Sequence, residues 1–271
     1  MLREKKYVLR FAALISCFIM ALVCSSCSNS TSPSNSNGQV QVTMVDAPAD
    51  YDQVNIVITS VAVHQAGADA NSGWVVINNA SSTYNMLMLR NGGSAVVGNG
   101  SLAAGHYTQI RLMVGSGCNV VIGGSPFSLD VSAQAQTGIV IDQEFDVQAG
   151  GTSELLLDFN ISQSIMMMSA SQFKLFPVIR HAPANSCGTI SGKIAPLLSV
   201  SAVTVFSGAD TVTSTIPDKN TGAFKLMALV QGTYTVKLSG SNFAFNDTTI
   251  ANVSVAARQN TDLGLITMRP K

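Results

Sequence analysis

The chain alternates apolar and polar residues over many short stretches from residue 38 onward. In 39–44 valine and methionine alternate with glutamine and threonine, and in 54–58 valine and isoleucine occupy every second position. A period of two residues is typical of a β-strand with one buried face. Beyond this stretch the apolar phase shifts at Thr59-Ser60 and resumes at Val61, which predicts a β-bulge.

The same pattern predicts further strands separated by glycine-rich turns. They are expected at 74–77, 106–114, 119–122, 139–145, 153–159, 173–179, 188–194, 203–205, 223–226, 233–238, 253–255 and 265–268. Turns are expected at Gly92-Gly93, Gly98-Asn99-Gly100, Gly123-Gly124 and Gly150-Gly151. Helical periodicity is hard to find, and the abundance of valine, isoleucine and threonine favours strands. The fold class is therefore predicted to be all-β, and the strand pattern before residue 184 suggests an immunoglobulin-like β-sandwich.

Charge changes sign along the chain and predicts a domain boundary. Residues 38–184 carry ten acidic against four basic residues, whereas residues 187–271 carry seven basic against four acidic ones. The change falls at the turn-forming segment 183–186, so we expect two domains, 38–184 and 187–271.

From residue 27 onward the chain has 11 basic and 14 acidic residues, which argues against nucleic acid as a partner.

The first 27 residues have the layout of an export signal. Basic residues precede an apolar run at 11–23, and the small residues of Cys24-Ser25-Ser26-Cys27 follow it. The alternative is an uncleaved membrane anchor, but the stretch from residue 11 through Cys24 as a helix would span only about 21 Å of the roughly 30 Å hydrocarbon core. We therefore predict a cleaved signal peptide at 1–26.

Cys27 with its two preceding serines resembles the cysteine of a bacterial lipobox, which becomes the lipidated N-terminus. The match departs from the usual pattern, because Cys24 stands where leucine is common; Cys24 itself suits lipidation less because bulky Val23 precedes it. The resemblance implies acyl chains that hold the protein on a membrane of the cell envelope, with the outer membrane expected, on its periplasmic face or at the cell surface. The segment 27–37 is polar and is expected to be a flexible tether.

Three separated blocks read VDAPADYDQVNI at 45–56, AGHYTQIRL at 104–112, and LDF at 157–159 with KLFPVI at 174–179. Together they resemble a family described as "domain of unknown function 4382", found in bacterial envelope lipoproteins. The resemblance covers roughly residues 38–182. It implies a β-sandwich and an envelope location, and it supplies no activity or catalytic residue.

The rest of the chain contains GTISGKI at 188–194, TGAF at 221–224 and GTYTV at 232–236. These segments resemble carboxypeptidase regulatory-like, or prealbumin-like, β-sandwich modules. In that family the module is a non-catalytic spacer or contact domain, so the resemblance implies a second β-sandwich without a reaction of its own.

Two cysteines remain after the leader and Cys27 are set aside. An exported protein occupies an oxidising compartment, which predicts a disulfide between Cys118 and Cys187. The alternative, a nucleophilic Cys118 beside a histidine, has no local signature to support it.

Three acidic residues between the first two strands are candidate cation ligands. Asp46, Asp50 and Asp52 could offer oxygen atoms to Ca²⁺. They lack the regular spacing of a calcium loop, and Asp46 before Ala47-Pro48 equally suits an ordinary turn. Both interpretations remain open, and no other cofactor is expected.

Other reactive residues are predicted to be structural. Asp142, Glu144 and Asp146 alternate along one strand and are expected to share a solvated face, with a binding stripe as the alternative. The histidines at 64, 106 and 181 show no zinc spacing. Met166-Met167-Met168 could suggest a soft metal site, but alternation along a strand favours core packing with one exposed methionine.

Three functions are compatible with these observations. The first is a non-catalytic, lipid-anchored envelope protein that presents β-sandwiches for binding or adhesion to a glycan or an envelope protein. The second is a structural subunit of an envelope complex, which an exposed apolar patch or an unpaired edge strand would favour. The third, an enzyme, would require acids, a histidine or Cys118 to converge in a pocket.

Overall fold

The computed structural model describes residues 37–47, 51–241 and 244–271, which fall in one compact unit, Ser36–Lys271. The predicted signal peptide and Cys27 lie outside the described residues, as does the tether apart from its last residue. The described part consists almost entirely of strands, so the all-β prediction is confirmed. None of its helices is long and apolar enough to cross a membrane.

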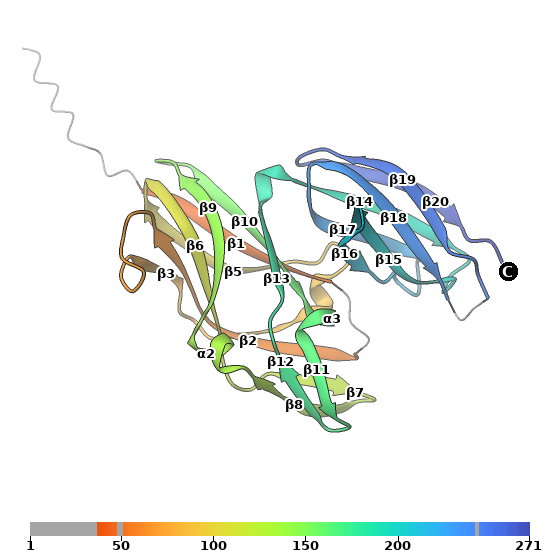
Figure 1. Cartoon of the computed structure of the whole chain (residues 1–271), viewed down its shortest axis with the longest axis horizontal. Helices are drawn as coiled ribbons and strands as arrows, with labels where there is room; N and C mark the ends of the chain where they lie inside the picture. Colours follow the sequence, from red (N-terminus) through yellow and green to blue (C-terminus); the bar gives the residue numbers. More distant parts are fainter. Residues whose placement is uncertain (1–36, 48–50, 242–243) are drawn as a thin grey trace, which may run out of the picture. The chain divides into compact units, whose positions relative to one another are not determined.

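Two β-sandwiches follow one another along the chain (Figure 1). We call residues 37–186 the N-terminal sandwich and residues 187–271 the C-terminal sandwich. Each has its own cluster of buried apolar side chains.

The N-terminal sandwich contains a four-stranded sheet and a nine-stranded sheet. The first has the order β13 (Ile179–Pro183), β10 (Thr152–Asn160), β1 (Asn37–Ala47), β5 (Ala95–Ala103). The second has the order β11 (Ile165–Ser169), β12 (Gln172–Leu175), β8 (Ser125–Val131), β7 (Asn119–Ile122), β2 (Gln53–Gln65), β6 (Gly105–Val114), β9 (Ile139–Val147); β3 (Trp74–Asn78) and β4 (Ser82–Asn85) also pair with β2. Its short helices are η1 (Met86–Leu89), α2 (Ala133–Thr137) and α3 (Ile161–Ser164).

The C-terminal sandwich follows η2 (Ala184–Ser186) and contains a three-stranded and a four-stranded sheet. The first has the order β17 (Ala223–Val230), β14 (Cys187–Ala195), β20 (Asn260–Thr267). The second has the order β16 (Asp210–Thr215), β15 (Val200–Ser207), β18 (Gly232–Gly240), β19 (Thr248–Val255).

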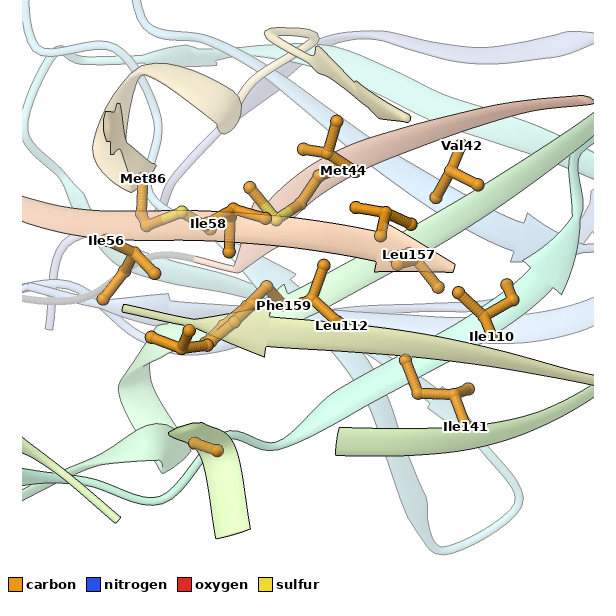
Figure 2. Packing of buried hydrophobic residues seen from close by; sticks show 14 of the residues in the cluster. Val42, Met44, Ile56, Ile58, Met86, Ile110, Leu112, Ile141, Leu157 and Phe159 are labelled. Atoms are coloured by element: carbon orange, nitrogen blue, oxygen red, sulfur yellow. The ribbon is translucent and has the colours of Figure 1, made fainter. Parts of the chain in front are cut away.

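The alternating positions seen in the sequence form the core of the N-terminal sandwich. Val42 and Met44 of β1 face Ile56 and Ile58 of β2, and all four are fully buried (Figure 2). Burying one such side chain contributes roughly 1.5–3 kcal/mol. The predicted β-bulge is also confirmed, because the register between β2 and β6 shifts between Ile58 and Ser60.

The turn expected at Gly98-Asn99-Gly100 is wrong, because these residues lie inside β5. A Cβ atom at Gly98 would lie 2.9 Å from Cδ1 of Ile77, and one at Gly100 would lie 3.1 Å from Cβ of Ile77. The glycines therefore allow β5 to pass close to β3. A glycine needed for close approach and a glycine needed for a turn look alike in a sequence.

The single strand expected at 173–179 is two strands in different sheets. β12 pairs with β8 in the nine-stranded sheet, whereas β13 pairs with β10 in the four-stranded sheet. The break contains Pro177, which has no N–H to donate to a ladder and restricts Phe176 before it. The segment therefore crosses from one layer of the sandwich to the other.

Candidate functional site

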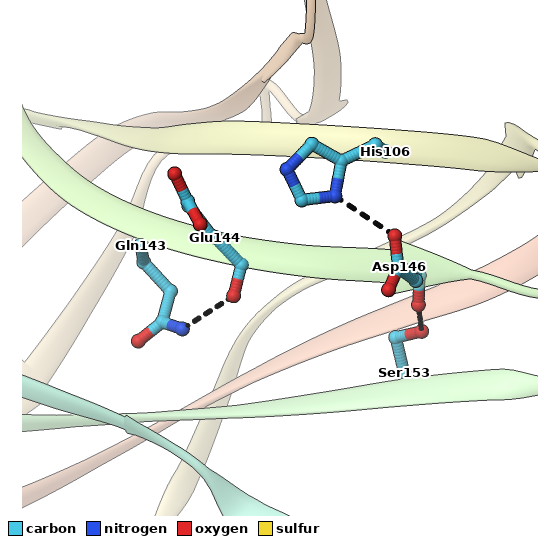
Figure 3. A network of polar contacts seen from close by, with 5 residues as sticks. All are labelled: His106, Gln143, Glu144, Asp146 and Ser153. Carbon is cyan, nitrogen blue, oxygen red and sulfur yellow. Dashed lines mark hydrogen bonds and ion pairs between the residues drawn. The ribbon is translucent and has the colours of Figure 1, made fainter.

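The outer face of β9 carries a row of carboxylates. Asp142, Glu144 and Asp146 are exposed, and the residues between them are buried, as the alternation predicted. Nδ1 of His106 on β6 lies 2.8 Å from Oδ1 of Asp146 (Figure 3), and the amide of Gln109 donates to Asp142 at 2.8 Å. The side chains of His106 and Asp146 are 44% and 74% exposed. This pair spans two neighbouring strands at the surface.

Gln143 is the polar residue on the buried face of the same strand. Its Oε1 lies 2.5 Å from Nδ1 of His181 on β13, and its Nε2 donates to the carbonyl of Glu144 at 2.8 Å. The oxygen of Gln143 requires a donor, so Nδ1 of His181 carries the proton. Burial lowers the pKa of His181, with an opposing effect from Asp142 and a further lowering by Arg180. The bond joins the edge of one sheet to the edge of the other.

A polar cavity of about 470 Å³ opens beside this network. It is lined by Glu144, Phe145, Asp146, Gln148, Gly151, Thr152, Ser153, Glu154, Leu155, Pro183, Asn185, Ser186 and Arg258. Nη2 of Arg258, from the C-terminal sandwich, lies 3.8 Å from Oε2 of Glu154. The cavity offers carboxylate and hydroxyl oxygens as hydrogen-bond acceptors, but its nearest histidine is already paired with Asp146.

A buried ion pair lies where the two sandwiches meet. Nη2 of Arg180 on β13 lies 2.7 Å from Oδ2 of Asp158 on β10, whose side chain is only 5% exposed. Nη1 of Arg180 donates to the carbonyl of Ala228 on β17 at 2.5 Å, and the hydroxyl of Thr213 on β16 is close enough to Asp158 to lower its pKa. Burial raises the pKa of Asp158, and the Arg180 guanidinium opposes that shift. Each charged partner therefore also contacts the C-terminal sandwich.

Asn91 forms the second polar contact between the sandwiches. It follows η1, and its φ of 54° lies in the left-handed region that asparagine tolerates. Its Nδ2 donates to the carbonyl of Ile216 at 2.7 Å, while its Oδ1 accepts from Oγ1 of Thr215 at 2.7 Å and from N of Lys225 at 3.2 Å. One side chain from the N-terminal sandwich thus binds both β16 and β17.

The candidate cation ligands are held by different parts of the backbone. Oδ1 of buried Asp46 accepts from N of Ile161 at 3.1 Å, and Oδ2 of Asp52 accepts from N of Gly124 at 3.0 Å. Asp50 lies outside the described residues. In the part of the chain that the structure describes, no group of three His, Cys, Asp or Glu side chains could hold a metal ion.

The predicted disulfide between Cys118 and Cys187 is absent from the structure, where both thiols are free and buried. Sγ of Cys118 accepts from N of Val57 and donates to the carbonyl of Gly115, both at 3.3 Å, inside the N-terminal core. Cys187 begins β14 opposite Val230. Burial raises the pKa of both thiols, which disfavours the nucleophilic thiolate. The correction follows from packing: Cys118 precedes β7 in the core of the N-terminal sandwich, whereas Cys187 begins β14 of the C-terminal sandwich, so the two thiols have different neighbours.

The expectation of one exposed methionine among Met166, Met167 and Met168 is also wrong. All three are exposed, by 53%, 61% and 59% respectively. They lie on β11, the last strand of the nine-stranded sheet. Met167 is paired with buried Phe173, so it lies on the core side of the sheet, but the four-stranded sheet opposite is too narrow to cover it.

The functional contacts that sequence reasoning missed are those of Asn91, Arg180 and Gln143. Asn91 precedes two glycines, which is a turn signal and predicted the loop. The signal did not indicate which strands the Asn91 side chain would contact. Gln143 at a core position of an alternating strand was a detectable anomaly, since a buried amide needs a partner. That partner, His181, is distant in sequence and could not be read from it.

Comparisons with known proteins identify a family and little else. The family model described as "Domain of unknown function (DUF4382)" matches residues 37–177, which confirms the resemblance seen in the sequence. No curated protein matches.

Some solved structures are similar over part or most of the chain, all with low TM-scores. A cohesin–X–dockerin complex of Acetivibrio cellulolyticus matches at 32% identity over 30% of this chain and 56% of that one, with a TM-score of 0.23. The minor pilin GBS52 of Streptococcus agalactiae matches at 11% identity over 86% and 96%, with a TM-score of 0.25. The TIE protein of Bacillus anthracis matches at 12% identity over 87% and 34%, with a TM-score of 0.26. This chain thus spans only about half of the cohesin–X–dockerin chain, and scores this low support no functional inference.

Removing the buried cation should destabilise the whole described unit. We expect Arg180→Met to lower the free energy of unfolding by about 3 kcal/mol, because Asp158 would stay buried without its partner. Urea denaturation followed by tryptophan fluorescence measures the change. The control is Lys237→Met, which breaks an exposed ion pair of similar length with Asp247 and should have a much smaller effect. Equal effects of the two variants would contradict a special role for Arg180.

Stability should depend on pH through His181. Because the folded pKa is lowered, the unfolded chain binds a proton at this residue below about pH 6.5 that the folded chain does not bind. The stabilisation is therefore present above that pH and lost as the pH falls toward the folded pKa. We expect the urea midpoint of the wild type to fall more steeply than that of His181→Gln on acidification from neutral pH. Parallel curves would show that His181 does not contribute.

Proposed function

This chain belongs to the family described as "Domain of unknown function (DUF4382)", and from that premise we propose that it is a non-catalytic, lipid-anchored protein of the cell envelope. In this proposal acyl chains on Cys27 hold it on a membrane, expected to be the outer membrane. The two sandwiches then form one coupled body that presents contact surfaces to another envelope macromolecule. The observation that carries the proposal is the junction made by Asp158, Arg180 and Asn91, which couples the sandwiches through partly buried polar contacts.

The reactive side chains support a structural role because each is engaged in a contact that maintains the fold. The Cys118 thiol is hydrogen-bonded to the backbone in the core, and its pKa is raised by burial. His106 is paired with Asp146, and His181 with Gln143. His64 lies 3.0 Å from the carbonyl of Asp69 through its Nε2 and packs on Trp74. These groups hold strands together.

Contact with another protein chain is favoured over glycan binding by the exposed methionines of β11. A large exposed apolar patch on an edge strand is typical of a surface that contacts another protein. The polar cavity beside β9 is the surface that a hydroxyl-rich polymer would use instead. Either a protein or a hydroxyl-rich polymer as partner would agree with the proposal that the two sandwiches present contact surfaces to another envelope macromolecule.

Lipidation can be tested by replacing each candidate cysteine. We expect Cys27→Ala to abolish incorporation of a labelled palmitate analogue and to move the protein out of the membrane fraction, because the acyl chains provide the anchor. Cys24→Ala is the matched control and should keep both label and location. Loss of label in Cys24→Ala but not in Cys27→Ala would overturn the choice of Cys27.

Display can be tested by cross-linking the tagged full chain in intact envelopes. We expect a discrete cross-linked complex with another envelope macromolecule, and we expect it to persist in Cys118→Ser and His106→Gln because neither side chain performs a reaction. Mass spectrometry and glycan staining identify what is recovered. A chain recovered alone over the full range of cross-linker concentration would contradict a display role.

A further inference from the structure

Strand β11 ends the nine-stranded sheet and presents three successive methionines. On one side it pairs with β12, and the strand order places no described strand on its other side. Among the described strands, no other has three consecutive large apolar side chains that are each more than half exposed. The free backbone N–H and C=O groups of an edge strand are a template for pairing with another chain.

Charge distinguishes β11 from β9, the other strand that ends the strand order of this sheet. Residues 159–173 contain no charged side chain, so β11 and its flanks are neutral. β9 exposes Asp142, Glu144 and Asp146, so two copies of β9 would bring like charges together. β11 also lacks the lysine or proline with which edge strands commonly prevent pairing.

We propose that β11 pairs antiparallel with the β11 of a second copy of this chain. The register that keeps all three methionines in the contact is centred on Met167. Met167 then lies opposite Met167 of the other copy, and Met166 lies opposite Met168. The pairing uses the same surface on both copies, so it closes as a dimer and does not grow further. A second copy fits because two identical edges that are neutral and apolar can pair without bringing like charges together.

The surroundings of β11 can accommodate a neighbouring strand. A hollow of about 430 Å³ lies beside Met168 and is lined by Ser128, Asp130, Met168, Ser171, Gln172, Phe173 and Lys174. The charges in it compensate each other, since Nζ of Lys174 lies 3.9 Å from Oδ2 of Asp130. Methionine side chains are flexible enough to adapt to an apolar neighbour.

The dimer rests on the proposed function in one respect. Lipid-anchored chains share one membrane, which raises their effective concentration.

Cysteine cross-linking in envelopes tests both the contact and its register. We expect Met167→Cys in the full chain to form a disulfide-linked dimer under mild oxidation at least about ten-fold more than Met88→Cys, because only residue 167 meets its own copy. Met88 is the matched control: it is 71% exposed in η1 of the same sandwich. Met166→Cys should cross-link less than Met167→Cys, because its neighbour across the pair is residue 168. Equal cross-linking at 88 and 167, or a link from 167 to a different protein, would overturn the proposal.

A second variant keeps the proposal testable in purified protein. We expect the wild type in detergent to shift from monomer to dimer with concentration by light scattering, and Met167→Lys to remain monomeric with an unchanged unfolding midpoint. A wild type that stays monomeric, together with no Met167→Cys dimer in envelopes, would overturn the dimer. The envelope complex with another macromolecule would then still test the proposed function independently.

Discussion

The contact between Asp158 and Arg180 is the constraint on which the arrangement of the two sandwiches depends. A carboxylate that is 5% exposed is unfavourable in a protein interior unless a cation and hydrogen-bond donors surround it. Arg180 provides the cation, and it reaches the carbonyl of Ala228 only when the C-terminal sandwich is in place. Arg180, which pairs with the buried carboxylate of the N-terminal sandwich, therefore also hydrogen-bonds the C-terminal sandwich. Asn91 adds a second attachment, so polar contacts at two places join the two sandwiches.

The unequal width of the two N-terminal sheets has the second large consequence. The wide sheet continues through β8 and β12 to β11, and the methionine side chains of this last strand receive little cover from the opposite layer. At β8 and β12 the inner side chains, such as Phe173, are still buried, but one strand further, at β11, Met167 is exposed. A sheet that extends beyond its partner layer leaves an apolar edge, and in this protein the edge is also uncharged. Coupling between the sandwiches and an open edge at β11 both support the proposal that this protein presents contact surfaces.

Much of the fold could be predicted from the sequence because strand formation leaves a local signature. The alternation in β2, β9 and β18 predicted the strands and their buried faces, and the phase shift at Thr59-Ser60 predicted the bulge. Errors arose where one residue type serves two purposes. Gly98 and Gly100 permit close approach to Ile77 instead of a turn, and Pro177 divides one apparent strand between two sheets.

Short patterns in the sequence predicted the all-β class, the inward and outward faces of most strands and the family, because strand alternation and family motifs are both local features of the chain. Tertiary structure alone decided what lies opposite each face. It placed Asp158 beside Thr213, Gln143 beside His181, and Cys118 and Cys187 in separate surroundings without a bond. It also decided that β11 ends a sheet wider than its partner, so three methionines that alternate along a strand are all exposed. The physical reason is that burial depends on the neighbouring layer, and a residue's own sequence neighbourhood does not contain that layer.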